Sequence, residues 1–159
     1  MLRKRIAFNA AALLVASLTG VGAQSTKKPA PAAAAGPAMT VHLTPTCGCC
    51  GKWVEHLKAA GFTVTTNVTT QLDAVPDRQR VPGQLRTCHT AVVGQYLVEG
   101  HVPADVIQKM LKEKPKVAGI AVPGMPIGSP GMETPGRAAE PYQILAFDRA
   151  GRVTVFAKR

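Results

Sequence analysis

The chain has 159 residues, with 19 lysines and arginines against 9 aspartates and glutamates, and a formal net charge of +10. Its basic residues are scattered and only 4% of its residues are aromatic, so it lacks the basic stacking surface that binds single-stranded nucleic acid. The length suits one small domain with a modest core. We therefore expect one folded domain and no nucleic-acid partner.

Residues 1–23 have the three-part form of a secretory signal peptide. Three basic residues at positions 3–5 precede an apolar stretch over residues 10–18, and the small residues 21–23 offer a cleavage site. The apolar stretch is shorter than the roughly 20 residues that span a bilayer. We predict export, with no membrane span after cleavage; a retained membrane anchor is the alternative. Without the leader, 16 basic residues face 9 acidic ones, a net charge of +7.

A linker separates this leader from the rest of the chain. Residues 24–38 consist mostly of Ala, Pro, Gly and Lys and offer little apolar surface to bury, which predicts a flexible tether. The folded domain is therefore expected over residues 39–159.

The first elements of this domain predict a strand, helix, strand unit. Residues 39–45 alternate in the manner of a short strand. Residues 52–61 place apolar side chains at helical spacing and end on a glycine, and residues 62–68 are rich in β-branched residues. Three cysteines lie where the first strand enters the helix. Residues 69–85 are polar and contain two prolines, which predicts a short helix with loops.

Residues 87–103 contain two β-prone runs around Gly94-Gln95, and glycine in the first central position favours a two-residue hairpin turn. If Val93 pairs with Tyr96, the register continues outward to place Cys88 opposite His101, with their Cβ atoms about 5 Å apart. A three-residue loop would instead pair His89 with His101. Both registers join the Cys-His dipeptide to His101.

The remaining elements complete an α/β pattern. A helix is predicted from Pro103, an irregular Pro/Gly-rich loop over residues 117–142, and a second hairpin around residues 148–151. Strand, helix, strand, helix-like segment, two strands and helix is the element order of thioredoxin-like domains. We predict a thioredoxin-like sandwich with an added Pro/Gly-rich loop and a C-terminal β-hairpin.

The cysteine turn leaves three chemistries open. Cys47 and Cys50 form a Cys-x-x-Cys pair at a helix start, where the helix dipole favours a thiolate and supports redox chemistry. Cys49 adds a third sulfur, and three thiolates on one turn suit Cu(I) or Zn²⁺. Four cysteines in an exported chain also allow two disulfides, although the adjacent Cys49 and Cys50 could not bond to each other without strain.

Further soft donors are candidate metal ligands. Cys88 and His101 complement the turn if the hairpin register holds, while His89 faces away from Cys88 in that register. Met125 and Met132 lie in the Pro/Gly-rich loop, and a thioether binds Cu(I) but has little affinity for Zn²⁺. The alternative for each methionine is that it anchors the loop to the core.

Two histidines are predicted to lie outside any centre built on the cysteines. His42 precedes Cys47 by five residues along a strand, roughly 16 Å at ~3.3 Å per residue. His56 follows Cys49 by seven residues, about 10 Å along a helix axis. No serine-protease order, phosphate-binding glycine motif or paired-carboxylate arrangement stands out, so no catalytic residue is assigned.

Several stretches together resemble an exported bacterial family linked to copper resistance, the CopG type, long described as a domain of unknown function and unrelated to the ribbon-helix-helix repressor of that name. The resemblance spans residues 41–156 and rests on PTCGCCGKW (45–53), VPGQLRTCHTA (81–91), VEGHVPA (98–104), GIAVPGMPIGSPGME (119–133) and PYQILAFDRAG (141–151). It implies a thioredoxin-like fold, a periplasmic location, and Cu(I) bound by thiolates and histidine, in one version as a multinuclear cluster.

The resemblance carries metal-site roles to five positions and places three more in shared motifs. The five are Cys47, Cys49, Cys50, Cys88 and His101, and the three are His89, Met125 and Met132. The leading hypothesis is a periplasmic protein that sequesters or transfers Cu(I), with copper ions and other periplasmic copper-handling proteins as partners. The alternatives are an oxidoreductase using Cys47 and Cys50, and a structural module held by zinc or disulfides.

Overall fold

The computed structural model describes residues 36–159. The predicted signal peptide, residues 1–23, and most of the predicted tether lie outside the described residues. The first strand begins at Ala38, one residue inside the predicted tether. Among residues 36–159, no helix has the length and apolar character needed to cross a bilayer.

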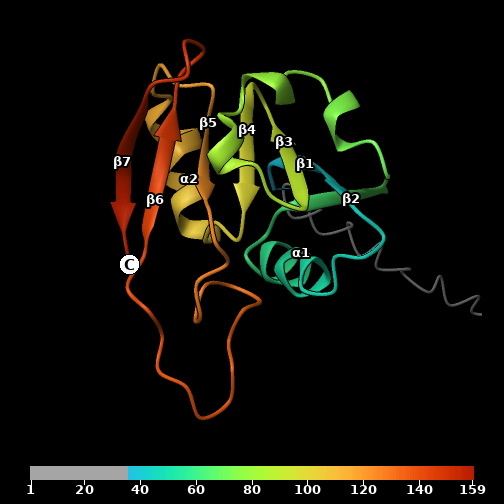
Figure 1. The fold of residues 1–159 in the computed structure, drawn as a ribbon, viewed down its shortest axis with the longest axis vertical. Helices are drawn as coiled ribbons and strands as arrows, with labels where there is room; N and C mark the ends of the chain where they lie inside the picture. Colours follow the sequence, from blue (N-terminus) through green and yellow to red (C-terminus); the bar gives the residue numbers. More distant parts are fainter. Residues whose placement is uncertain (1–35) are drawn as a thin grey trace, which may run out of the picture. The chain divides into compact units, whose positions relative to one another are not determined.

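One mixed sheet of seven strands forms the centre of the domain, in the order β2-β1-β3-β4-β5-β6-β7 (Figure 1). The pairs β1/β2 and β4/β5 are parallel, and the other neighbours are antiparallel. The strands are β1 (Ala38–Leu43), β2 (Thr63–Val68), β3 (His89–Val93), β4 (Tyr96–Gly100), β5 (Gly119–Val122), β6 (Gln143–Phe147) and β7 (Val153–Lys158). The predicted α/β class is confirmed.

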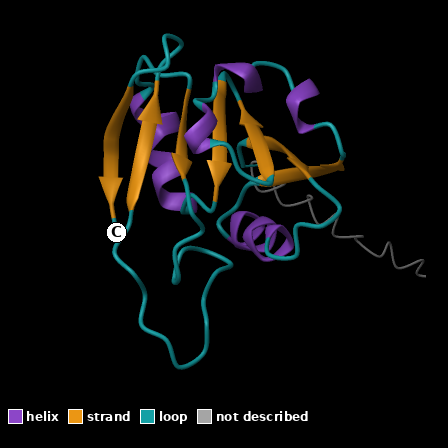
Figure 2. Cartoon of the chain, in the orientation of Figure 1, coloured by secondary structure: helices purple, strands orange, loops and turns teal. Residues whose placement is uncertain are grey.

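Two α-helices and three short helical turns connect the strands (Figure 2). Helix α1 spans Cys50–Ala59 and starts two residues before the predicted helix, at a cysteine of the turn. Helix α2 spans Ala104–Glu113 and follows Pro103, which occupies the N-cap position. The polar segment between β2 and β3 contains three 3₁₀ turns, η1 (Leu72–Ala74), η2 (Arg78–Arg80) and η3 (Gly83–Leu85).

The main core lies between the sheet and the two α-helices. Helix α1 contributes Trp53 and Leu57, both fully buried, and α2 contributes Ile107 and Met110. They pack against strand residues that alternate with period two, as a sheet with a buried face requires. A smaller cluster includes Val81, Leu85, Leu97, Ala121 and Phe147.

The first hairpin has the predicted register, with Val93 opposite Tyr96 and Thr90 opposite Glu99. The second hairpin also forms as predicted, from β6 and β7. One prediction was wrong, because residues 119–122 form strand β5 inside the segment assigned to an irregular loop. All four of these residues are buried and paired parallel to β4, so they lack the apolar-polar alternation that marks a half-exposed strand.

Candidate metal centre

Strand pairing brings the cysteine turn against the start of β3. The antiparallel register of β1 and β3 places Leu43 opposite His89, and the Thr44 N–H donates to the Cys88 carbonyl at 3.1 Å. Strand β1 ends at Leu43, and the turn continues from Thr44 to Cys50, the first residue of α1. The cysteine turn and the Cys88-His89 dipeptide, about 40 residues apart in sequence, therefore meet at one end of the β1/β3 pair.

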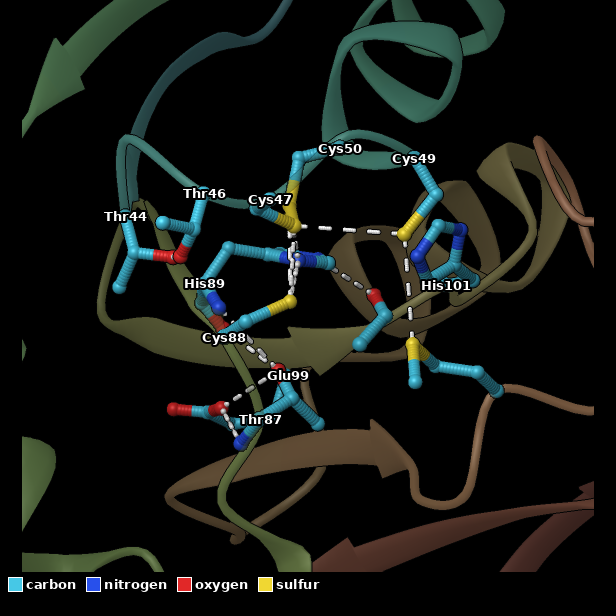
Figure 3. The surroundings of a disulfide bond; sticks show 12 residues. Thr44, Thr46, Cys47, Cys49, Cys50, Thr87, Cys88, His89, Glu99 and His101 are labelled. Carbon is cyan, nitrogen blue, oxygen red and sulfur yellow. Dashed lines mark hydrogen bonds between the residues drawn. A yellow bond between two sulfur atoms is a disulfide. The ribbon is translucent and has the colours of Figure 1, made fainter.

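Four soft donor atoms gather where these segments meet (Figure 3). The Sγ atoms of Cys47, Cys50 and Cys88 and a ring nitrogen of His89 all lie within 4.8 Å of one another. Cys88 Sγ is 2.8 Å from Cys47 Sγ and 3.7 Å from Cys50 Sγ. Two sulfurs that share a metal at about 2.3 Å each can lie up to about 4.6 Å apart. The group thus has the donor types and spacing of a thiolate–imidazole metal site.

Cys47 and Cys50 are joined by a disulfide, while Cys49 and Cys88 are free. The disulfide joins the two cysteines that the Cys-x-x-Cys motif predicts as a redox pair. The four cysteines therefore form one disulfide, and not the two that the disulfide alternative allowed. A disulfide sulfur is not a thiolate ligand. Three-thiolate metal binding at this group therefore requires prior reduction of the Cys47–Cys50 bond by two electrons and two protons.

His89 presents a free nitrogen to the cysteines. Its Nε2 lies 3.0 Å from the Gly100 carbonyl, an acceptor only, so Nε2 carries the proton and Nδ1 keeps its lone pair. Nδ1 is 3.2 Å from Cys50 Sγ. Burial, reinforced by the nearby His101, lowers the pKa of His89 to about 4, so the imidazole is neutral at neutral pH. Trp53 packs on this ring with a centroid distance of 4.6 Å and holds its orientation.

His101 has the same hydrogen-bonding pattern. Its Nδ1 donates to the Pro130 carbonyl at 2.7 Å, and its fully buried Nε2 has no hydrogen-bond partner within the described residues. Burial lowers the pKa of His101, which favours the neutral ring. Its ring meets that of His89 edge-on at 5.3 Å between centroids. Histidines that bind metals usually donate their other N–H to a carbonyl in this way, so both rings are prepared as ligands.

The two histidines do not take the places that the hairpin register predicts. Paired residues extend from Val93/Tyr96 only to Thr90/Glu99, and Gly100 then adopts a positive φ of 71°. The prediction that Cys88 stands directly opposite His101 in the ladder was therefore wrong. His89 was predicted to face away from Cys88, yet its Nδ1 lies 4.0 Å from Cys88 Sγ. Strand alternation fails here because Cys88 precedes β3 and is outside the ladder.

Cys49 and the two loop methionines lie beside the four-residue group. Cys49 Sγ is 4.0 Å from Cys47 Sγ and 4.0 Å from Met125 Sδ. Met132 and Cys49 both line an open pocket of about 280 Å³, which includes Lys52. The Pro/Gly-rich loop thus places two methionines beside the cysteine turn.

Burial, followed by the charge of Cys49, raises the pKa of the Cys88 thiol, which is therefore protonated at neutral pH without a metal.

His42 and His56 lie outside the four-residue group. His42 Nδ1 is 3.3 Å from the Asn67 side-chain amide. His56 Nε2 accepts a hydrogen bond from the Ala104 N–H at 3.0 Å and thereby satisfies a free donor at the start of α2. Both histidines have roles in local structure.

A buried charged network behind the site was not assigned by sequence reasoning. Glu99, fully buried, accepts hydrogen bonds from the Thr87 N–H at 2.9 Å and from the Thr87 and Thr90 hydroxyls. Arg78 donates to Thr90 Oγ1 and to the Thr87 carbonyl, and its Nε lies 3.4 Å from Glu99. Thr87 and Thr90 flank the Cys88-His89 dipeptide, so the Arg78–Glu99 pair holds both of its ends. The sequence feature that could have revealed this network is Glu99 itself, a glutamate in an otherwise apolar strand.

Gly100 is required where β4 ends and the chain turns toward His101. A Cβ atom there would overlap the backbone oxygen of Val122, and the positive φ disfavours any other residue. We expect Gly100→Ala to lower the free energy of unfolding by about 2 kcal/mol or more, measured by urea denaturation. Gly94→Ala is the matched control, because Gly94 also has a positive φ but an added Cβ meets no atom within 4 Å. Equal losses in the two variants would contradict this reason.

The fold and the site together define a class of protein: a mixed α/β domain with a cysteine–histidine group whose reduced form suits a soft metal ion. Two solved structures, named copper resistance protein CopG, form 2 and form 1, are each 46% identical to the chain, with TM-scores of 0.71 and 0.70. Each alignment covers 77% of this chain and 98% of the solved one. A family model described as a protein of unknown function, DUF411, matches residues 85–132. No functionally curated protein matches the chain.

The chain belongs to the CopG family of copper resistance proteins. The family resemblance predicted from the sequence motifs is thereby confirmed. The Cys/His group and the named relatives together support a copper-related function.

Proposed function

We propose that the reduced chain binds Cu(I) through Cys47, Cys50, Cys88 and His89 and sequesters or transfers it in copper resistance. The observation that carries this proposal is the convergence of three sulfurs and one imidazole nitrogen within 4.8 Å. Thiolate and neutral imidazole are soft ligands that suit Cu(I). Each binding thiol releases its proton to solvent, and the neutral His89 needs no deprotonation.

The surroundings of this group support more than one copper ion per chain. Cys49 Sγ lies 4.0 Å from Cys47 Sγ, and His101 offers a buried nitrogen with a free lone pair. A thiolate sulfur has enough lone pairs to bridge two Cu(I) ions. We therefore extend the proposed ligand set to Cys49 and His101, with Met125 and Met132 nearby. Zinc is the less favoured ion, because the named relatives are copper resistance proteins.

We further propose that residues 1–23 direct export and that the domain works in the periplasm, receiving copper from other copper-handling proteins there or passing it to them. An oxidising compartment is consistent with the Cys47–Cys50 disulfide, and copper binding would protect the reduced form.

The strand order β2-β1-β3-β4, with α1 after β1 and α2 after β4, supports our assignment of the segment from β1 to α2 as thioredoxin-like.

Anaerobic titration with Cu(I) tests the binding function. We expect the fully reduced domain to bind two or more Cu(I) ions per chain in competition with a chromophoric chelator. The same protein carrying the intact Cys47–Cys50 disulfide should bind fewer ions, because two sulfurs are withdrawn. Equal stoichiometry in both redox states, or preference for Zn²⁺ over Cu(I), would contradict the proposal.

A second candidate function is favoured by the disulfide itself. Cys50 is the first residue of α1 and Cys47 precedes it by three residues, close to the helix N-terminus, where the helix dipole stabilises an attacking thiolate. An oxidoreductase using this pair would act on copper or on protein thiols. Its turnover would be lost in Cys47→Ser and in Cys50→Ser, and a thiol–disulfide exchange assay with both variants tests this.

A further inference from the structure

The loop methionine Met125 has no packing role that explains its position. Its side chain is 43% exposed, and it is one of three large hydrophobic side chains exposed on residues 36–159. Its thioether nonetheless lies 4.0 Å from Cys49 Sγ (Figure 3 shows the Cys49 side chain and its dashed contact). An exposed apolar side chain directed at a thiol gains little from burial, so its position calls for another reason.

The backbone of the loop holds Met125 in an unfavourable conformation. Met125 has a φ of +48° directly after Gly124 at +80°, and the left-handed region is unfavourable for a residue with a Cβ atom. Pro123 and Pro126 flank these two residues and restrict the backbone on both sides. Strain of this kind, held by its surroundings, is found at ligand-binding positions. The loop places the Met125 thioether beside the cysteine turn instead of burying it in the core.

The sulfur atoms form a continuous series from the surface to the buried group. Met125 Sδ is 4.0 Å from Cys49 Sγ, Cys49 Sγ is 4.0 Å from Cys47 Sγ, and Cys47 Sγ is 2.8 Å from Cys88 Sγ. Two sulfurs can hold one ion together when they lie within about 4.6 Å of each other, given metal–sulfur bonds of about 2.3 Å. Every step in the series meets this limit. A soft ion can thus move along it without losing all of its ligands at once.

We propose that Met125 and Cys49 form the port through which Cu(I) enters and leaves the buried thiolates, a proposal that rests on the Cu(I) function above. Cu(I) is first held by the Met125 thioether and the Cys49 sulfur as it leaves the ligands of its donor. It then passes to Cys47 and Cys88 by ligand exchange. The Cys49, Cys47 and Cys88 thiols each lose a proton to solvent as they bind copper, and the oxidation state of copper does not change.

A port residue differs from an equilibrium ligand in what its loss changes. Met125 is neutral and exposed, whereas the buried group offers thiolates and imidazole, so the bound ion resides with the latter. Loss of the thioether therefore raises the barrier to exchange without altering the end state. By microscopic reversibility, uptake and release slow by the same factor, and the dissociation constant is unchanged.

Stopped-flow transfer of Cu(I) between the reduced protein and a chromophoric chelator, in both directions, tests the port. We expect Met125→Leu to slow uptake and release about tenfold each. This is the lower end of the roughly 10- to 100-fold effect that mutations around a metal site have on affinity or activity. Equilibrium titration should give wild-type stoichiometry and affinity. Met39→Leu, a thioether removed from the hydrophobic core beside β3, is the control and should exchange at the wild-type rate.

The outcomes separate the port from the binding function. Wild-type exchange rates in Met125→Leu would overturn the port while leaving Cu(I) binding intact. A loss of affinity with unchanged uptake would also overturn it, because Met125 would then be a ligand of the bound state. Failure of the wild-type protein itself to bind Cu(I) would overturn the proposed function, and the port with it.

Discussion

Cys88→Ser is expected to abolish Cu(I) binding at the buried group while leaving the Cys47–Cys50 pair intact. Outside the Cys47–Cys50 disulfide, Cys88 Sγ is the sulfur that contacts both partners, at 2.8 Å from Cys47 and 3.7 Å from Cys50. A serine hydroxyl is a hard donor that binds Cu(I) poorly. We expect an affinity loss of more than about 100-fold, since removal of an outer partner of a metal ligand alone costs about 10- to 100-fold. Competition titration under anaerobic, reducing conditions measures it.

The same variant distinguishes the two candidate functions. A thiol–disulfide activity of Cys47 and Cys50 should survive in Cys88→Ser, because neither sulfur of that pair is altered. Thr46→Ser is the matched control, since it changes an exposed side chain in the same turn and leaves every sulfur in place. Wild-type Cu(I) affinity in Cys88→Ser would show that the buried group is not the copper site.

Glu99→Gln is expected to lower the free energy of unfolding by about 3 kcal/mol, because it leaves the buried Arg78 guanidinium without its buried counter-charge. Both side chains are nearly or fully buried, and their closest atoms are 3.4 Å apart. Burial raises the pKa of Glu99, while hydrogen bonds from Thr90 and Thr87 and the charge of Arg78 act in the opposite direction. Urea denaturation of the reduced, metal-free domain measures the loss through the midpoint at constant m.

Asp73→Asn provides the control for this loss. Asp73 contacts the same Arg78 at 2.6 Å, but its side chain is 75% exposed, so its removal should cost at most about 1 kcal/mol. The double variant Arg78→Met with Glu99→Gln should recover part of the loss, since no unpaired buried charge remains. Equal losses in Glu99→Gln and Asp73→Asn would show that burial does not determine the strength of these pairs.

Local patterns predicted much of the fold. The Gly94-Gln95 turn defined the hairpin register, and β-branched and helical periodicities located the strand, helix, strand unit around the cysteine turn. Strand β5 was missed because a short strand buried on both faces has no alternation to detect. The Arg78–Glu99 pair was missed because the 3₁₀ turn that carries Arg78 has no pattern linking it to β4.

The amino-acid sequence was sufficient to identify the side chains available for soft-metal chemistry and the segments that carry them, because donor type and local spacing are properties of the chain. Which of these donors meet depends on the packing of distant segments. The β1/β3 pairing brings Cys88 and His89 to the cysteine turn, and Gly100 turns the chain at the end of β4. Strand alternation determines which way a side chain points only for residues that are paired in the sheet. Beyond its last pair, packing against Trp53 and the carbonyl of Gly100 sets the direction of His89.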